Sequence, residues 1–242
     1  MKKTVCAVLF LAALWWAFSA ILSRPFLPSP LTVTLEMLRE LGGGSLMIHL
    51  GSSLFRVLTA LAAAFVPALV LGVLSGTVKA ADSMVSPVVY VLFPVPKIAL
   101  LPIILLFLGL GDLSKIFLVA LIVFFQFYLE IRDGTAAVNR HYFDSLYTLG
   151  GSRRDLLVHV ILPALLPRIF SSLRLTLGTA FAVLFLAETF ATRLGIGWYI
   201  MDSWSRVAYA QMYAGIMALS LAGLLFFAVL DLLQRLFCRW TL

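Results

Sequence analysis

The chain has 242 residues, of which 62% are apolar and 12% are charged, and its mean hydropathy is +1.07. Soluble domains are roughly half apolar and a quarter charged, so this composition excludes a water-soluble protein and indicates an integral membrane protein. The net charge of +7 fits Lys and Arg in cytoplasmic loops better than it fits a nucleic-acid partner.

Six stretches are apolar and long enough for helices that cross a bilayer, which takes about 20 residues. The first follows two lysines and is longer than the apolar core of a secretory signal, so we predict a retained span rather than a cleaved signal. The six are residues 4–23, 57–78, 84–110, 116–129, 175–192 and 212–230. They predict an all-α integral membrane protein with about six transmembrane helices.

Residues 84–110 contain Pro94, Pro96 and Pro102, each of which removes a backbone donor and disfavours helix in the residue before it. We therefore predict a kinked helix that lines a path across the membrane. Three interpretations of Lys97, between these prolines, stay open: it attracts an anionic solute, extends toward lipid headgroups, or lies in a broken segment lined by protein.

The lysines and arginines indicate the orientation, because cytoplasmic loops carry an excess of both. If the N-terminus is inside, most of them fall in inner segments. This bias predicts that both termini lie in the cytoplasm.

The outer segment, residues 24–54, begins with a proline-rich turn and then favours a short amphipathic helix over residues 31–41, which three consecutive glycines end. No feature marks a domain boundary, so we predict a single transmembrane domain over residues 1–242. Within it, residues 1–54 hold the first span and the outer segment, and residues 55–242 form the core.

The inner loop, residues 131–172, is the most polar part of the chain. Its residues 135–149 favour an amphipathic helix that ends at a pair of glycines. Ser152, with Asp155 three residues later, matches a capping box that opens a second helix. We expect this helix to end at Leu162, where Pro163 and Pro167 interrupt it. Two short helices joined by a glycine elbow predict a compact projection that docks a cytoplasmic partner.

One pattern in this loop is specific. The chain has Asp144, Ser145 and Leu146, three further residues, Gly150, nine further residues, and then Val160, Ile161, Leu162 and Pro163. This pattern resembles the signature loop of binding-protein-dependent ABC importer permeases, Glu-Ala-Ala, three residues, Gly, nine residues and Ile-x-Leu-Pro. Asp replaces Glu and Ser-Leu replaces Ala-Ala, while the glycine and the final Leu-Pro keep their places.

Two further segments extend the likeness over most of the chain. Residues 94–115 include Pro94, Pro96, Lys97 and Pro102, and residues 187–197 include Ala187-Glu188 and Leu194-Gly195-Ile196-Gly197. Both resemble the nitrate, sulfonate, taurine and bicarbonate branch of these permeases.

The resemblance implies a type I ABC importer permease fold, in a subunit that forms the translocation path and hydrolyses no ATP. It also implies a second copy of the chain, two cytoplasmic ATPase subunits that bind the ATP, and a periplasmic or lipid-anchored solute-binding protein at a bacterial inner membrane. No cofactor is expected in this chain itself. The implied cargo is a small anion such as a sulfonate, taurine or nitrate, and a thiamine-precursor-like vitamin is the alternative.

The resemblance also implies which residues act. We expect the loop to contact the ATPase through Asp144, Ser145, Leu146, Gly150, Arg153, Arg154, Leu162 and Pro163. Gly150 is also explained as an ordinary helix C-cap, and Arg153 and Arg154 as solvated charges. The candidates for the path or its gate are Pro94, Pro96, Lys97, Pro102 and Glu188.

Glu188 is a carboxylate inside an apolar stretch, which is costly and marks a functional candidate. A role in gating or in a subunit interface competes with a position in water at the outer surface, because Arg193 follows only about 7 Å of helix rise later. The aromatic residues of the next loop favour an interfacial belt or a contact with a periplasmic partner. They are Trp198, Tyr199, Trp204 and Tyr209.

Two other classes of function compete. A stand-alone channel or secondary transporter needs neither ATP nor a cytoplasmic partner, and the docking loop and the absence of an inverted-repeat signal count against it. An intramembrane enzyme needs a nucleophile–base pair, but His49, His141 and His159 fall in predicted loops. The sequence has no phosphate-binding loop and no cluster of metal ligands, so we predict a non-catalytic subunit.

Overall fold

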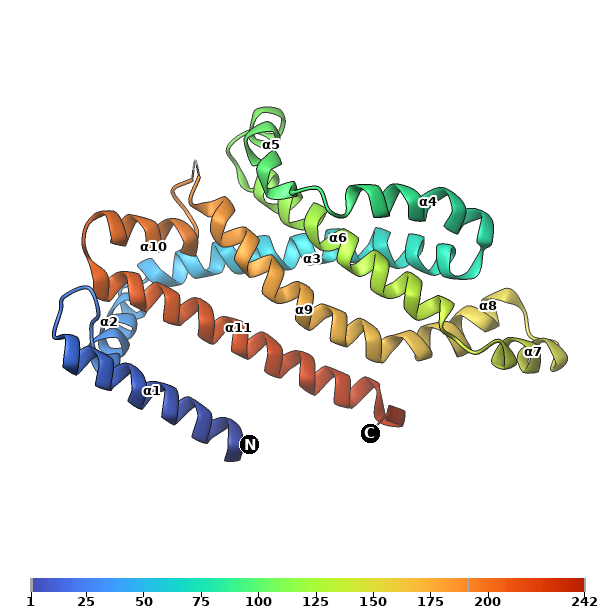
Figure 1. The fold of residues 1–242 in the computed structure, drawn as a ribbon, viewed down its shortest axis with the longest axis horizontal. Coiled ribbons are helices and arrows are strands. Elements are labelled where there is room, and N and C mark those ends of the chain that lie inside the picture. The colour runs from blue at the N-terminus through green and yellow to red at the C-terminus, as the bar shows by residue number, and fades with distance from the viewer. Residues whose placement is uncertain (1, 191, 242) are drawn as a thin grey trace. The chain divides into compact units, whose positions relative to one another are not determined.

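The computed structural model describes residues 2–190 and 192–241, and every regular element in these residues is a helix (Figure 1). The elements are α1 (Lys2–Leu22), α2 (Pro30–Gly42), α3 (Ser45–Thr77), α4 (Lys79–Leu92), the 3-10 helix η1 (Lys97–Leu100), α5 (Leu101–Leu108), α6 (Asp112–Ala136), α7 (Arg140–Thr148), α8 (Arg153–Leu156), the π-helix η2 (Leu157–Ile161), α9 (Leu162–Glu188), α10 (Ile196–Ser205), α11 (Tyr209–Phe237) and the 3-10 helix η3 (Arg239–Thr241). The all-α prediction is confirmed.

Four helical segments of the described chain are long and apolar enough to cross a membrane: α3, α6, the continuous run Arg153–Glu188, and α11. A fifth span is possible if α4 and the segment Lys97–Leu108 count as one, although they are bent by 80° at a short break. In α1 the apolar helix Leu9–Leu22 is shorter. All six predicted stretches therefore carry helix, and the third is divided in two, as its prolines predicted.

Helix α3 begins at Ser45, well before residue 57, where we predicted the second span to start. Gly44, with φ of +81°, turns the chain after α2, and nothing after it stops the helix. Pro67 lies inside α3 without ending it, as prolines do in membrane helices whose neighbours compensate for the lost hydrogen bond.

Helix α6 is longer at both ends than the predicted residues 116–129. Lys115 is fully buried near its start, and its Nζ donates to the carbonyl oxygens of Leu110 and Gly111 at 3.0 and 3.2 Å. Arg132 near the other end donates two hydrogen bonds to Asp82. Because both charges are compensated inside the protein, neither marks an end of the helix.

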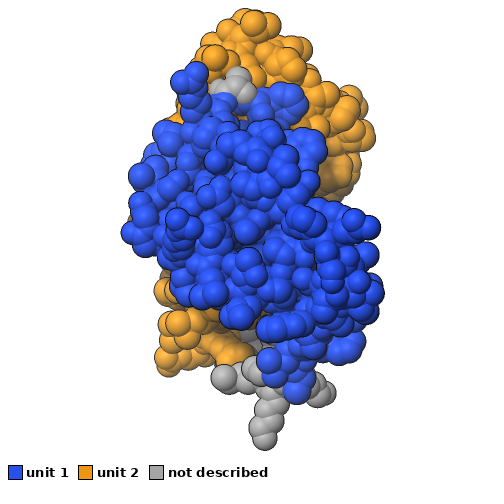
Figure 2. Space-filling model, turned by 90° about the vertical axis from the view of Figure 1, so that its left-hand side faces the viewer, with its two compact units in different colours: residues 1–55, 188–222 blue, residues 56–187, 223–242 orange. Residues whose placement is uncertain are grey.

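The chain divides into two compact units, which Figure 2 shows in different colours. Unit 1 contains residues 1–55 and 188–222, and unit 2 contains residues 56–187 and 223–242. Unit 1 therefore holds α1, α2, α10 and the start of α3, whereas unit 2 holds the long middle parts of α3, α6 and α9.

In unit 2, close packing of α3, α6 and α9 depends on glycines. A Cβ on Gly72 would lie 2.9 Å from Ile131 Cγ2, and one on Gly76 would lie 2.4 Å from Thr135 Cβ. A Cβ on Gly134 would lie 2.7 Å from Leu165 Cδ2. Small residues let helix backbones approach in membranes, where packing drives association. They bring α6 against α3 on one side and against α9 on the other.

In unit 1, the short helices are fixed by local caps and cross-contacts. Ser29 caps α2, because its side chain accepts a hydrogen bond from the amide of Thr32 at 3.2 Å. Gln211 Nε2 donates to Glu40 Oε1 at 3.0 Å and so joins the start of α11 to α2. The predicted amphipathic helix of the outer segment is thus confirmed as α2.

Candidate functional site

The polar loop of unit 2 forms two helices, α7 and α8, joined by a tight turn. We call residues 140–156 the elbow. The side chain of Asn139 accepts a hydrogen bond from the amide of His141 at 3.0 Å and opens α7. The predicted pair of helices is therefore present, although α6 extends to Ala136 and shortens the first of them.

Gly150 makes the turn of the elbow. Its φ is +80°, a left-handed conformation that strongly favours glycine. Its amide donates to the carbonyl oxygen of Tyr147 at 3.0 Å, and the amide of Gly151 donates to that of Leu146 at 2.9 Å. These two bonds form a Schellman motif, which compensates two free carbonyl groups at the end of α7. Gly150 is thus a helix C-cap and the bend of the elbow at once.

The start of α8 is equally well defined. Ser152 and Asp155 form the predicted capping box, in which the amide of Ser152 donates to Asp155 Oδ2 at 2.8 Å. Gly151, the second glycine of the pair that we predicted to end the first helix, is also needed for space, because a Cβ on it would lie 2.6 Å from Leu146 Cγ. With both helix ends capped, the elbow has one defined shape.

The surface of the elbow is unusual for a charged loop. Asp144 and Ser145 are exposed, and α7 has no buried residue. Tyr142 is 63% exposed and Leu149 is 84% exposed. Leu146 instead packs, only partly buried, against the core of unit 2. Leu146 thus anchors the elbow, while Tyr142 and Leu149 leave large apolar side chains exposed, which are typical of a protein-binding surface.

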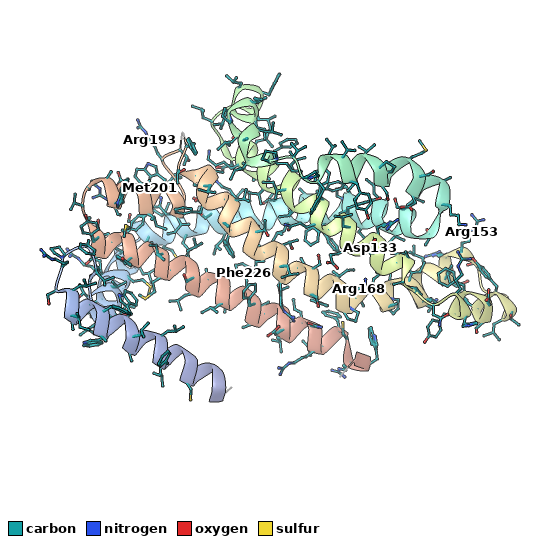
Figure 3. The ribbon with its side chains drawn as sticks, viewed as in Figure 1. Asp133, Arg153, Arg168, Arg193, Met201 and Phe226 are labelled. Carbon is teal, nitrogen blue, oxygen red and sulfur yellow. The ribbon has the colours of Figure 1, made fainter. Side chains whose placement is uncertain are left out.

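Arg153 and Arg154 begin α8 and are exposed (Figure 3 labels Arg153). Neither guanidinium has an ion-pair partner within the described part of the chain. Both are therefore available to a partner or to solvent.

The elbow borders a cavity of about 840 Å³ in unit 2. The cavity lies between the end of α3, including Val73 and Thr77, and the elbow, including Tyr147 and Leu156. The elbow is therefore not closely packed against the end of α3 at this cavity.

We predicted that Pro163 and Pro167 would interrupt the helix after Leu162, and this prediction is wrong. Leu162 and Pro163 instead begin α9, and Pro167 lies inside it. The preceding turn is the π-helix Leu157–Ile161, in which the amide of Leu162 donates to the carbonyl oxygen of Leu157. A wider turn absorbs the missing donor of a proline. The elbow is therefore continuous with α9.

The three prolines of the third stretch lie at its break. Pro94 and Pro96 separate α4 from η1, and Pro102 lies in the first turn of α5, where its missing amide hydrogen is tolerated. Lys97 is 9% exposed. Its Nζ donates to the carbonyl oxygens of Leu92 and Phe93, each at 2.9 Å, so it caps the end of α4.

Of the three interpretations of Lys97, this geometry matches the broken segment lined by protein. A third bond to the carbonyl oxygen of Val95, at 3.4 Å, occupies the remaining donor, and the ring of Phe125 lies 4.2 Å from Nζ. With its donors engaged, the ammonium group stabilises the break between the two helices.

Glu188 belongs to unit 1 and is fully buried, so of its two interpretations the position in water at the outer surface does not hold. It ends α9, and its carboxylate accepts hydrogen bonds from Ser53 Oγ at 2.8 Å and from the amide of Gly197 at 2.9 Å. Ser53 Oγ in turn accepts from the amide of Ile196 at 2.7 Å. Glu188 and Ser53 thus cap the start of α10, where a negative charge is favoured.

Gly195 completes this contact, because a Cβ on it would lie 2.3 Å from Glu188 Cδ. Its amide donates to Nδ1 of His49, which lies in α3 rather than in the predicted loop. The imidazole stacks on Trp198 with ring centres 5.1 Å apart. Spacing in the sequence alone gave no signal for Ser53 or His49, because both lie far from Glu188 along the chain.

Of the aromatic residues that we expected in an interfacial belt, some are packed inside the protein and others are exposed. Tyr199 is buried in α10, and this burial, with the nearby negative charge of Glu40, raises the pKa of its phenol well above the usual value. Trp204 is 56% exposed. Only the exposed part of the set is available to lipid or to a periplasmic partner.

The ion pairs in unit 2 were not predicted, and two of them join different helices through a buried or partly buried arginine. Arg132 Nε and Nη2 bond to the two oxygens of Asp82 at 2.9 and 2.8 Å, which links α6 to α4. Arg56, only 3% exposed, lies with Nη2 2.6 Å from Asp112 Oδ1. From the sequence we treated both arginines only as charges in loops, because no local pattern indicates an ion-pair partner that is distant along the chain.

Comparisons with known proteins agree with the resemblance found in the elbow. Residues 68–241 match the family model of the binding-protein-dependent transport system inner membrane component. The chain is 31% identical to the taurine transport system permease protein TauC of Escherichia coli strain K12 over 238 residues. This alignment covers 95% of this chain and 86% of the relative.

Two other relatives show the range of cargo within this similarity. The chain is 30% identical over 230 residues to the putative aliphatic sulfonates transport permease protein SsuC of Bacillus subtilis strain 168, covering 94% of this chain and 83% of the relative. It is 27% identical over 233 residues to the formylaminopyrimidine transport permease protein ThiX of Halalkalibacterium halodurans, in an alignment that covers 96% of this chain and 93% of the relative.

Proposed function

The chain belongs to the family of binding-protein-dependent transport system inner membrane components, and on this premise we propose that it imports a small sulfonate-type solute as the permease subunit of an ABC transporter. Its apolar helices make it a multi-pass membrane protein. We propose that it works as a homodimer with both termini in the cytoplasm, together with two ATPase subunits and a solute-binding protein.

The observation that carries this proposal is the exposed apolar face of the elbow. Leu149, 84% exposed, and Tyr142, 63% exposed, lie outside the regular membrane spans. Exposed apolar side chains of this size favour a protein groove. A cytoplasmic ATPase subunit offers such a partner, and the exposed Asp144, Arg153 and Arg154 then form the polar rim of the contact.

The elbow is connected to the spans in a way that transmits movement. It follows α6 closely and continues through η2 into α9 without a break. At Gly134 the two helices approach closely, and Figure 3 shows the neighbouring Asp133 and Arg168 on them. We infer that ATP-driven closure of the ATPase subunits moves the elbow, that α6 and α9 move with it, and that the path then opens outward.

The cargo assignment follows the relatives. The taurine and aliphatic sulfonate permeases are more than a quarter identical to the chain over nearly its whole length. A sulfonate is therefore the cargo we propose. The formylaminopyrimidine permease supports a second candidate, an aminopyrimidine, and the assay below tests it in parallel.

The test is uptake by proteoliposomes that contain the chain, its ATPase subunit and its binding protein. We expect labelled sulfonate to accumulate only with ATP on the ATPase side and the binding protein on the other side. A vesicle that lacks the ATPase subunit is the matched control. Accumulation in that control would contradict the proposal and establish a stand-alone channel or secondary transporter.

A further inference from the structure

A second cavity of unit 2 lies between α6 and α9 and has a volume of about 250 Å³. Phe93, at the end of α4, contributes to its wall. Its size suits a small solute rather than a drug-sized ligand. The other lining residues are Gln126, Leu129, Glu130, Ser172, Leu175, Thr176 and Thr179.

The threonine hydroxyl groups of this cavity are acceptors toward a solute. Thr176 Oγ1 donates to the carbonyl oxygen of Ser172 at 2.8 Å, and Thr179 Oγ1 donates to that of Leu175 at 3.3 Å. A hydroxyl has one hydrogen and two lone pairs. Because each hydroxyl hydrogen is donated within α9, the hydroxyl oxygens offer a solute only their lone pairs.

Two further polar atoms at the cavity residues are buried without a partner in the described part of the chain, namely Gln126 Oε1 and Ser172 Oγ. Gln126 Nε2 points toward Thr179 Oγ1 at 3.4 Å, which leaves the amide oxygen unused. A buried polar atom without a partner is costly, and such atoms are often completed by a ligand or water.

Glu130 adds a negative charge to this lining. Its side chain is exposed although it lies within the span α6, and no ion pair involves it within the described residues. Three cations that neighbour lining residues are engaged. Arg132 bonds to Asp82 and Asp133, Lys97 bonds to carbonyl oxygens, and Arg174 pairs with Asp231, although its Nε has no hydrogen-bond partner among the described residues. A carboxylate of this kind in a membrane span faces water or a solute path, because lipid would not solvate it.

We propose that this cavity is a contact site for the cargo in the translocation path and that it binds the amino group of an amine-bearing solute. The carboxylate of Glu130, the threonine lone pairs and the unpartnered Gln126 Oε1 suit an ammonium or amino donor, and the Ser172 hydroxyl can accept as well as donate. The cargo is therefore an aminosulfonate or another amino-bearing solute rather than a simple anion. Glu130 is the specificity residue. This inference rests on the proposed import function.

The test compares uptake of two solutes that share a sulfonate group, namely taurine and ethanesulfonate, which lacks the amine. Glu130→Gln removes the charge at constant size. We expect it to lower taurine uptake at least about tenfold, as for the loss of one charge-assisted hydrogen bond. Thr179→Val, which removes one acceptor at similar volume, should give a smaller loss for taurine.

The matched control is Glu36→Gln, which makes the same Glu-to-Gln change in α2 and outside the cavity. It should leave the taurine rate near wild type. The amount of assembled complex and its basal ATP hydrolysis are measured for each variant, so that misfolding is separated from lost recognition. An aminopyrimidine is included as a second amine-bearing solute.

Wild-type taurine uptake in Glu130→Gln would overturn the inference while leaving the importer function intact. ATP-driven import of ethanesulfonate but of no amine-bearing solute would overturn it as well. ATP-independent uptake of every solute would instead refute the proposed function itself, and with it the inference.

Discussion

The amide of Gly151 donates a hydrogen bond to the carbonyl oxygen of Leu146 at 2.9 Å, and a Cβ on this glycine would lie 2.6 Å from Leu146 Cγ. The backbone bond and the close approach occur together, so the end of α7 and the start of α8 are held against each other. This contact gives the elbow the shape in which it can act as a rigid lever on α6 and α9.

Gly151→Ala should therefore destabilise the elbow. The added methyl group must displace Leu146, and this overpacking should lower the free energy of unfolding by about 1–3 kcal/mol. Thermal unfolding of the detergent-purified chain measures the effect. Gly42→Ala is the control, because a Cβ there has nothing within 4 Å. Equal melting temperatures for the two variants would show that Leu146 does not constrain the elbow.

Glu188→Gln should loosen the start of α10. The Glu188 carboxylate accepts hydrogen bonds from the Ser53 hydroxyl and the Gly197 amide, and the substitution replaces it by an amide that has donors of its own. We expect the free energy of unfolding to fall by roughly 1–3 kcal/mol. Hydrogen exchange of the Ile196 and Gly197 amides should accelerate. Asp144→Asn, at an exposed carboxylate, should change neither quantity. Unchanged exchange in Glu188→Gln would contradict the proposed cap.

Asp82 and Arg132 should be energetically coupled. A double-mutant cycle with Asp82→Asn and Arg132→Gln should give an interaction energy of about 1 kcal/mol or more, because the pair is bidentate and partly buried. The cycle for Asp202 and Arg206, an i,i+4 pair in which Arg206 is exposed and only Asp202 Oδ2 is bonded, should give only about 0.3–0.5 kcal/mol. Equal coupling in both cycles would mean that α4 and α6 are not held by this pair.

Leu149→Asp should weaken binding of the ATPase subunit without unfolding the chain. Leu149 is 84% exposed, so a carboxylate there costs little in the isolated chain. In a desolvated interface it should reduce the affinity by about 10- to 100-fold, as at other interface hot spots. Affinity between detergent-purified subunits measures this, and Leu149→Ala should give an intermediate value. Full affinity in Leu149→Asp would place the docking surface elsewhere.

Much of the fold was predictable because each membrane helix is encoded by a continuous apolar stretch of the sequence. Apolar runs predicted where helix forms in six stretches, although only four or five of these are long and apolar enough to cross a membrane, and Pro94 and Pro96 predicted the break in the third. The capping box of Ser152 and Asp155 was predictable for the same reason, since its two residues are three positions apart. Where both partners of an interaction lie within one turn, the sequence contains the information.

Contacts between distant segments were not predictable in this way. Ser53 and Glu188 are 135 residues apart, and nothing near either residue indicates the other. The continuity of α9 through Pro163 was missed because the compensating π-turn depends on packing rather than on a motif. The acceptor-rich cavity was missed because its character depends on where the threonine hydroxyl groups donate.

The most direct test of coupling through the elbow compares two glycines of the same geometry. Gly150 and Gly44 have φ of +80° and +81°, and a Cβ on either has nothing within 4 Å. A β-branched residue is strained equally at both positions. The measurement is ATP hydrolysis stimulated by the loaded binding protein, with Gly150→Val or Gly44→Val in the reconstituted complex. We predict that Gly150→Val abolishes the stimulation while Gly44→Val retains it. Full stimulation with Gly150→Val would contradict the account, because the elbow would then be only a linker.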